Sequence, residues 1–216
     1  MKSKKNIVFV IMVFLLFVSS CKEKATTQDV NIIWEKGLEY AQEGDFDNAI
    51  TVFSLVIQLT PDFAMAYNNR GYMYFLKEED DKAITDYNMV IRLDPEYDPA
   101  YYFRGRAYSR KEDYNNAIAD FTQAIRRNPN AADIYFERGL AYAEKRDFDN
   151  AIADFTQSIN INPDISSSVY FNLGLVYMLK GDLNQGIANY EAALRVDPNN
   201  AQARRNLQAA RNERGY

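Results

Sequence analysis

Apolar and small residues recur along this chain with the spacing of amphipathic helices, and the whole pattern repeats about every 34 residues. The repeats begin at Val30, Ala64, Asp98, Ala132 and Ser167. Counted from these starts, positions 4, 11 and 24 are apolar or aromatic and position 20 is small. Spacings of 4 and 7 place these residues on one helical face. Each repeat is therefore predicted to hold two amphipathic helices joined by a short polar turn, such as Gly44-Asp45.

Glycine and proline mark the same period. Position 8 is always glycine, and the five are 34, 34, 34 and 35 residues apart: Gly37, Gly71, Gly105, Gly139 and Gly174. A glycine inside a helix costs about 1 kcal/mol relative to alanine. We therefore expect another backbone to pack there too closely for a β-carbon, with the small residues of position 20 as the opposing surface. The prolines of position 32 are predicted to end each second helix.

This pattern resembles the tetratricopeptide repeat from residue 30 to residue 199. The resemblance implies an all-α, right-handed α-solenoid of five helix-turn-helix repeats. Their predicted bounds are 30–63, 64–97, 98–131, 132–166 and 167–199. Residues 200–216 are predicted to form a capping helix, because Ala203, Leu207 and Ala210 share one face and the other face is polar.

Two features depart from the pattern, and we expect looser packing at both. Position 17, aromatic or leucine in the other repeats, is Asp80 in the second repeat. The last repeat has one extra residue before its first helix, in the run from Ser166 to Ser168.

One charged pair recurs in the three middle repeats. Position 7 is Arg70, Arg104 and Arg138, and position 23 is Asp86, Asp120 and Asp154. In the first and last repeats both positions change together. This paired loss indicates that the two residues meet, within a repeat or between neighbours, in a ladder that fixes the stacking angle.

The resemblance also implies that the first helices line a concave face, through positions 2, 5, 6, 9, 12 and 13. Position 5 supplies the first candidate partner-binding residues, Trp34, Asn68, Tyr102, Phe136 and Phe171. Positions 9, 12 and 13 add Tyr72, Phe75, Arg106, Arg110 and Met178. An exposed aromatic groove is typical of a partner site. The alternative is that the same rings fill gaps between neighbouring first helices.

The N-terminus has the features of a secretory signal. Three lysines precede the apolar run Ile7 to Val18, which is too short for a comfortable membrane span. The sequence Val18-Ser19-Ser20-Cys21 is similar to the bacterial lipobox, in which the cysteine is lipidated and becomes the mature N-terminus. We predict a signal peptide at 1–20 and a lipid-anchored tether at 21–29. The alternatives are an uncleaved anchor, or an ordinary signal followed by an incidental cysteine.

Composition argues against most catalytic chemistry. The chain has no histidine, which removes histidine-based nucleophile systems, general bases and metal ligands. Neither a cofactor nor a metal is expected. Without residues 1–20 the net charge is −8, from 22 basic and 30 acidic residues, so nucleic-acid binding is disfavoured.

These observations predict a non-enzymatic adaptor that is tethered by lipid to the bacterial cell envelope and binds a peptide or helix in its concave groove. A second copy of the chain is a further candidate partner. The alternative is a binding component that delivers an apolar small molecule or lipid to an envelope transporter, since the same aromatic groove would suit such a ligand.

Overall fold

The computed structural model describes residues 26–163 and 165–215, so Cys21, the predicted signal and most of the predicted tether lie outside the described residues. Regular secondary structure in the described part is α-helical. The helices are α2 (Thr27–Gln42), α3 (Phe46–Leu59), α4 (Ala64–Leu76), α5 (Asp80–Leu93), α6 (Asp98–Arg110), α7 (Tyr114–Arg127), α8 (Ala132–Glu144), α9 (Phe148–Ile161), α10 (Ser167–Leu179), α11 (Leu183–Val196) and α12 (Ala201–Arg214).

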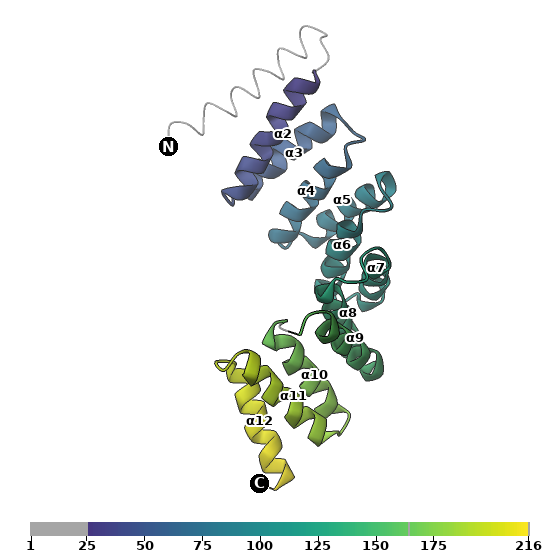
Figure 1. Ribbon diagram of the computed structural model, residues 1–216. Helices are drawn as coiled ribbons and strands as arrows, with labels where there is room; N and C mark the ends of the chain where they lie inside the picture. Colours follow the sequence, from purple (N-terminus) through teal and green to yellow (C-terminus); the bar gives the residue numbers. More distant parts are fainter. Residues whose placement is uncertain (1–25, 164, 216) are drawn as a thin grey trace.

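Successive helices pack in pairs, and the pairs stack into a curved solenoid (Figure 1). Each first helix packs on the second helix of its own repeat and on that of the repeat before, and α12 covers α11. The first helices α4, α6, α8 and α10 also touch one another in succession, which places them on the inner side of the curve. The predicted fold class, an all-α solenoid of five helix pairs with a C-terminal capping helix, is confirmed.

Short polar side chains set where the second helices begin. In four repeats an aspartate caps the second helix and accepts a hydrogen bond from the backbone N–H three residues on: Asp45, Asp113, Asp147 and Asp182. Just before this cap, position 15 has positive φ in every repeat. It is Gly44 and Gly181 in the outer repeats, but a charged residue at φ of 60–61° in the middle three.

Helix α2 starts earlier than the sequence predicted. Thr26 caps it through a capping box, in which its hydroxyl accepts from the Asp29 N–H at 3.2 Å and Asp29 accepts from the Thr26 N–H at 2.9 Å. The predicted tether 21–29 is therefore helical from Thr27 onward. Across the described part of the chain, no helix has both the length and the apolarity to cross a membrane.

Each repeat is closed by a contact between its position-8 glycine and its position-24 aromatic ring. A β-carbon on Gly37, Gly105, Gly139 or Gly174 would lie 2.6–2.9 Å from ring atoms of Phe53, Phe121, Phe155 or Tyr190. The expectation that a second backbone excludes the β-carbon was therefore wrong, because a buried side chain occupies the space. Only at Gly174 does a backbone atom, the carbonyl oxygen of Gly186, also come within 3.1 Å.

The predicted arginine–aspartate pairs form within each middle repeat and also reach the repeat before. Arg104 donates from Nε and Nη2 to the two carboxylate oxygens of Asp120 at 2.7 and 2.6 Å, and from Nη1 to Asn88 of the preceding repeat at 2.5 Å. Arg70 and Arg138 make the same set of contacts, to Ser54 and Thr122 of the repeats before them. Neighbouring repeats are thus linked through a bidentate, buried ion pair.

The aspartates of this ladder are buried at 2–5% exposure. Burial raises the pKa of the Asp86 and Asp120 carboxyl groups, and the hydrogen bonds from Arg70 and Arg104 only partly offset this. The ladder therefore costs desolvation energy as well as fixing geometry.

The looser packing expected at Asp80 is not found. Its side chain is only 14% exposed and pairs with Arg110 of the next repeat, so a polar contact replaces the usual apolar one. The neighbouring Asp81 also pairs with Lys111 of the next repeat, although its side chain is 83% exposed. At the other departure, Ser166 caps α10 through the Ser168 N–H, and residue 164 is outside the described part of the chain.

A Gly105→Ala substitution tests the glycine–ring contact. Alanine has the better helix propensity by about 1 kcal/mol. However, its β-carbon would lie 2.8 Å from Phe121, and overpacking of this kind costs about 1–3 kcal/mol. We expect a lower midpoint of urea unfolding, measured by circular dichroism, and partial rescue by Phe121→Leu. Gly71→Ala is the control, since its nearest neighbour is 3.1 Å away and it should lose less. A Gly105→Ala protein more stable than wild type would contradict this account.

An Asp120→Asn substitution tests the ladder. Arg104 would keep a buried charge without its carboxylate, which costs about 3 kcal/mol. Asp81→Asn is the matched control because its carboxylate is 83% exposed and its pair with Lys111 is worth below about 1 kcal/mol. Both free energies of unfolding are measured by urea titration. Equal losses in the two variants would show that the buried pair has no special role.

Candidate functional site on the inner helices

The position-5 aromatic side chains each pack on the position-24 ring of their own repeat. The ring centroids are 5.3 Å apart for Trp34 and Phe53 and 5.8 Å apart for Phe136 and Phe155. Tyr102 and Phe171 make the same contact, at 6.2 and 5.8 Å. All four residues remain half-buried. These ring contacts lie within single repeats, against the second helix, and not between neighbouring first helices as the alternative interpretation held. Part of each position-5 ring still remains accessible.

Asn68 is the exception at position 5. It is 9% exposed and donates to Asn69 at 3.2 Å, but its Oδ1 finds no hydrogen-bond partner within the described residues. Met178 is half-buried and lies over Gly186, whose added β-carbon would meet its sulfur at 2.4 Å.

Between the second and third repeats, the predicted groove is filled by the protein itself. Phe75 is only 5% exposed, and the ring of Phe103 packs 6.0 Å from it and 5.0 Å from the Tyr72 ring. The guanidinium groups of Arg106 and Arg110 lie 5.0 and 3.7 Å from the Phe75 ring centroid. Arg110 also donates to the Phe75 carbonyl at 2.7 Å. The structure thus brings four predicted groove residues together in one internal cluster, in which two arginine guanidinium groups lie over packed aromatic rings. These residues are Tyr72, Phe75, Arg106 and Arg110.

Between the third and fourth repeats, the inner surface is charged. Arg106 pairs with Glu137 at 3.3 Å. Burial raises the pKa of the Glu137 carboxyl, against the opposing effect of Arg106. Burial, together with the nearby Glu137 charge, raises the pKa of the Tyr102 hydroxyl to about 12. Tyr102 therefore stays neutral and able to donate at physiological pH.

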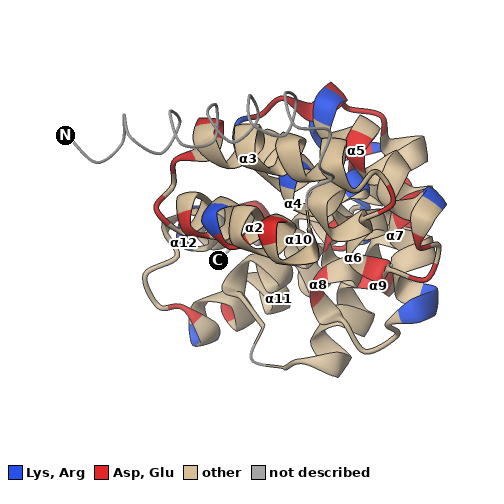
Figure 2. Cartoon of the chain, turned by 90° about the horizontal axis from the view of Figure 1, so that it is seen from above, with Lys and Arg blue, Asp and Glu red and all other residues tan. Residues whose placement is uncertain are grey.

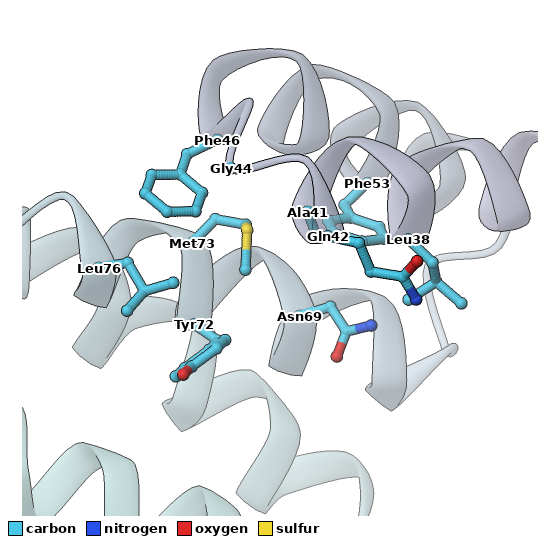
Figure 3. Close-up of a pocket in the computed structure, with 10 residues that line it drawn as sticks. All are labelled: Leu38, Ala41, Gln42, Gly44, Phe46, Phe53, Asn69, Tyr72, Met73 and Leu76. Carbon is cyan, nitrogen blue, oxygen red and sulfur yellow. The ribbon is translucent and has the colours of Figure 1, made fainter.

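A hollow of about 550 Å³ lies between the first and second repeats (Figure 3). Its lining has no charged side chain and comes from α2, α3, the turn between them and α4. The lining residues are Leu38, Ala41, Gln42, Gly44, Phe46, Phe53, Asn69, Tyr72, Met73 and Leu76. Figure 3 shows the carboxamides of Gln42 and Asn69 facing the same gap between α2 and α4.

Two of the residues at the hollow are smaller than their equivalents at the next interface. Position 12 of the first repeat is Ala41 and position 6 of the second is Asn69, where the next interface has Phe75 and Phe103. Of the lining residues, only Tyr72 was among the predicted site residues. A comparison of positions 6 and 12 between neighbouring repeats would have marked this interface, together with the fourth, where Ala143 and Asn172 hold the same positions.

Large apolar side chains are also exposed along the inner helices. Met65 and Leu76 on α4 and Leu179 at the end of α10 are 37%, 40% and 56% exposed. Leu93 and Val196, at the ends of second helices, are comparably exposed at 36% and 40%. In the described residues, no group of histidine, cysteine, aspartate and glutamate side chains could hold a metal ion.

Known protein families match most of the solenoid. The tetratricopeptide repeat family matches residues 64–97, 102–164 and 167–200, and the TPR repeat family matches residues 37–77. The chain is a tetratricopeptide repeat protein. No curated protein matches it in sequence.

Solved structures similar to this tetratricopeptide repeat protein include a crystal structure of MamA. The two are 28% identical with a TM-score of 0.73 over 77% of this chain and 96% of that one. MamA from Desulfovibrio magneticus RS-1 is 15% identical, with a TM-score of 0.77 over 82% of this chain and 99% of that one. YrrB, described as a TPR protein with an unusual peptide-binding site, is 18% identical, with a TM-score of 0.74 over 89% and 96%. The last two show a shared fold alone.

The tetratricopeptide repeats support a protein-interaction scaffold as the general role of this protein. Along the solenoid, the inner surface has three chemically different regions, one at each of the first three interfaces between repeats. These are an open apolar hollow, a filled aromatic and cationic cluster, and a charged centre around Arg106 and Glu137.

Proposed function

We propose that this protein is a non-enzymatic adaptor of the bacterial cell envelope, anchored by lipid on Cys21, that binds a peptide or helix on the inner surface of its first helices. The observation that carries the binding role is the apolar surface left exposed there. Met65 and Leu179 lie on inner helices and are not covered by their own repeats. Exposed apolar side chains along a concave face are suited to a partner of matching shape. The unusual peptide-binding site described for YrrB is consistent with this use of the fold.

Removing apolar contacts from the inner surface tests the binding role. We expect Met65→Asn combined with Leu179→Asn to weaken partner capture at least tenfold, because a buried apolar side chain contributes about 1.5–3 kcal/mol. Capture is measured by crosslinking in cells followed by pull-down and quantitative mass spectrometry. These side chains are better targets than Trp34, Tyr102 or Phe136, whose rings pack on the core.

The matched control is Leu93→Asn combined with Val196→Asn, which changes two residues at the ends of second helices that are 36% and 40% exposed. It should leave capture unchanged, and both double variants should keep wild-type helical content. If the inner-surface variant recovers the same partners at the same level as wild type, the proposed binding surface is wrong.

The proposed anchor rests on the N-terminal sequence. Cys21 is the only cysteine and directly follows the signal-like run that ends in Val18-Ser19-Ser20. Acyl chains contribute about 0.8 kcal/mol per buried CH₂, and two or more chains hold a protein firmly at a membrane. Because α2 begins at Thr27, the lipid would hold the first repeat close to the bilayer.

A Cys21→Ala substitution tests the anchor. The variant should remain unprocessed, or be cleaved elsewhere and become soluble, and it should take up no clickable palmitate analogue. Labelling is followed by gel fluorescence, and membrane association by fractionation. A wild-type protein that takes up no label, with a variant that is processed and fractionates in the same way, would overturn the lipid anchor. An ordinary secreted or signal-anchored solenoid would then remain.

A carrier of an apolar small molecule or lipid is the second candidate function. The uncharged hollow of about 550 Å³ favours it, since this is within the size of ordinary ligand pockets. Native mass spectrometry of gently purified protein distinguishes the two functions. A bound small molecule would favour the carrier, whereas a clean apo mass would favour the adaptor.

A further inference from the structure

We propose that the hollow between the first two repeats is an anchoring pocket for one large apolar side chain of a bound peptide, and that the carboxylates of α2 beside it favour a basic residue next to that side chain. This inference rests on the proposed function, because it names the chemistry of the peptide that the inner surface would bind.

The lining of the hollow selects an uncharged apolar group. Leu38, Phe46 and Leu76, the more accessible apolar residues of the lining, offer only hydrocarbon and aromatic surface. A charged side chain placed there would lose its hydration without gaining a partner. The carboxamides of Gln42 and Asn69 (Figure 3) can each donate and accept hydrogen bonds. They could therefore bind the backbone N–H and C=O groups of a peptide on either side of the inserted residue.

The next interface shows what this chain places in the equivalent space. There, Phe75 and Phe103 fill the positions held by Ala41 and Asn69, and the guanidinium of Arg110 lies 3.7 Å from the Phe75 ring centroid. The first interface lacks both the rings and the cation, since position 13 of its following repeat is Leu76 where the second interface has Arg110. An aromatic or aliphatic side chain with a neighbouring cation would supply from a partner what the second interface holds internally.

The charges around the hollow favour that cation. Between residues 30 and 63 the first repeat has six acidic residues and one basic residue, a net charge of −5, and it is the most acidic of the five. Figure 2 shows acidic segments along α2 and its following turn. Lys36 already pairs with Glu39 at 2.5 Å. Within the described residues, Glu35 and Glu43 have no ion pair, so they can attract a basic residue.

Both carboxylates lie close to the hollow along α2. Glu35 is one turn before Leu38 on the same helix, and Glu43 directly follows Gln42. Exposed charges of this kind contribute modestly to affinity but set partner preference and salt dependence. The pocket would thus fix the position of the peptide, and the carboxylates would select its sequence.

Selection from a phage-displayed library of random twelve-residue peptides tests the proposal, with the full-length protein held in lipid nanodiscs. We expect enriched peptides to share a large aliphatic or aromatic residue adjacent to lysine or arginine. Synthetic versions of these peptides are then titrated by fluorescence anisotropy against the wild type and the variants.

The decisive variant fills the hollow with the residues of the next interface, Ala41→Phe and Asn69→Phe. It should weaken peptide binding at least tenfold. The matched control is Ala143→Phe and Asn172→Phe, the same two residue types at the same repeat positions between the fourth and fifth repeats, and it should change binding less than twofold. Glu35→Gln with Glu43→Gln should weaken binding about threefold and reduce its salt dependence.

A milder variant keeps the test valid if the filled protein does not fold. Leu76→Asn removes one partly exposed lining residue and should also weaken binding, with unchanged circular dichroism.

Peptides that bind normally to these variants, or that share no apolar residue, would overturn the pocket assignment. If such peptides still depend on Met65 and Leu179, the proposed function stands without this pocket. If no peptide binds at all, both the pocket assignment and the proposed peptide-binding function are wrong. A small molecule that occupies the hollow in native mass spectra, and is lost on filling it, would also overturn the assignment.

Discussion

The contact between the position-8 glycine and the position-24 aromatic ring sets how closely the two helices of each repeat approach. The ring edge lies where a β-carbon would be, so the first helix can seat directly on a fully buried side chain. A second ring, from position 5 of the same first helix, also packs on this aromatic in four of the repeats. The close approach thus creates the layer from which the inner surface is built.

The stacking of one repeat on the next depends on a different interaction. In the three middle repeats an arginine binds the aspartate of its own repeat with two nitrogens and a side chain of the preceding repeat with the third. A guanidinium is rigid and planar, so this arrangement fixes direction as well as distance. Exposed lysines add a second link between neighbours, as with Lys77 and Asp47 or Lys180 and Asp149, at the turns.

Because these contacts are constant, the inner surface can vary without changing the fold. The second interface is closed by Phe75, Phe103 and Arg110, whereas the first, lined by Ala41 and Asn69, is hollow. Position 17 shows the same freedom, since Asp80 is accommodated by pairing with Arg110 of the following repeat. Differences in binding chemistry along the solenoid therefore arise from a few positions that the helix-pair geometry does not constrain.

The sequence by itself determined the number of repeats, their two-helix form, the capping helix and the residues of the arginine–aspartate ladder. These depend on local periodicity and on contacts that recur at a fixed spacing, so five copies of the pattern reveal them. The tertiary structure decided which side chain packs against each glycine, which residue pairs with Asp80, and which predicted groove residues remain accessible to a partner. The sequence pattern indicates Phe75 as a groove residue, but two arginines from the next repeat cover it. The hollow beside Leu38 lies where two small side chains from different repeats, Ala41 and Asn69, line one interface. Ala143 and Asn172 occupy the same positions at the fourth interface, so residue type at these positions does not by itself single out the first interface. The packing between helices of different repeats decides it.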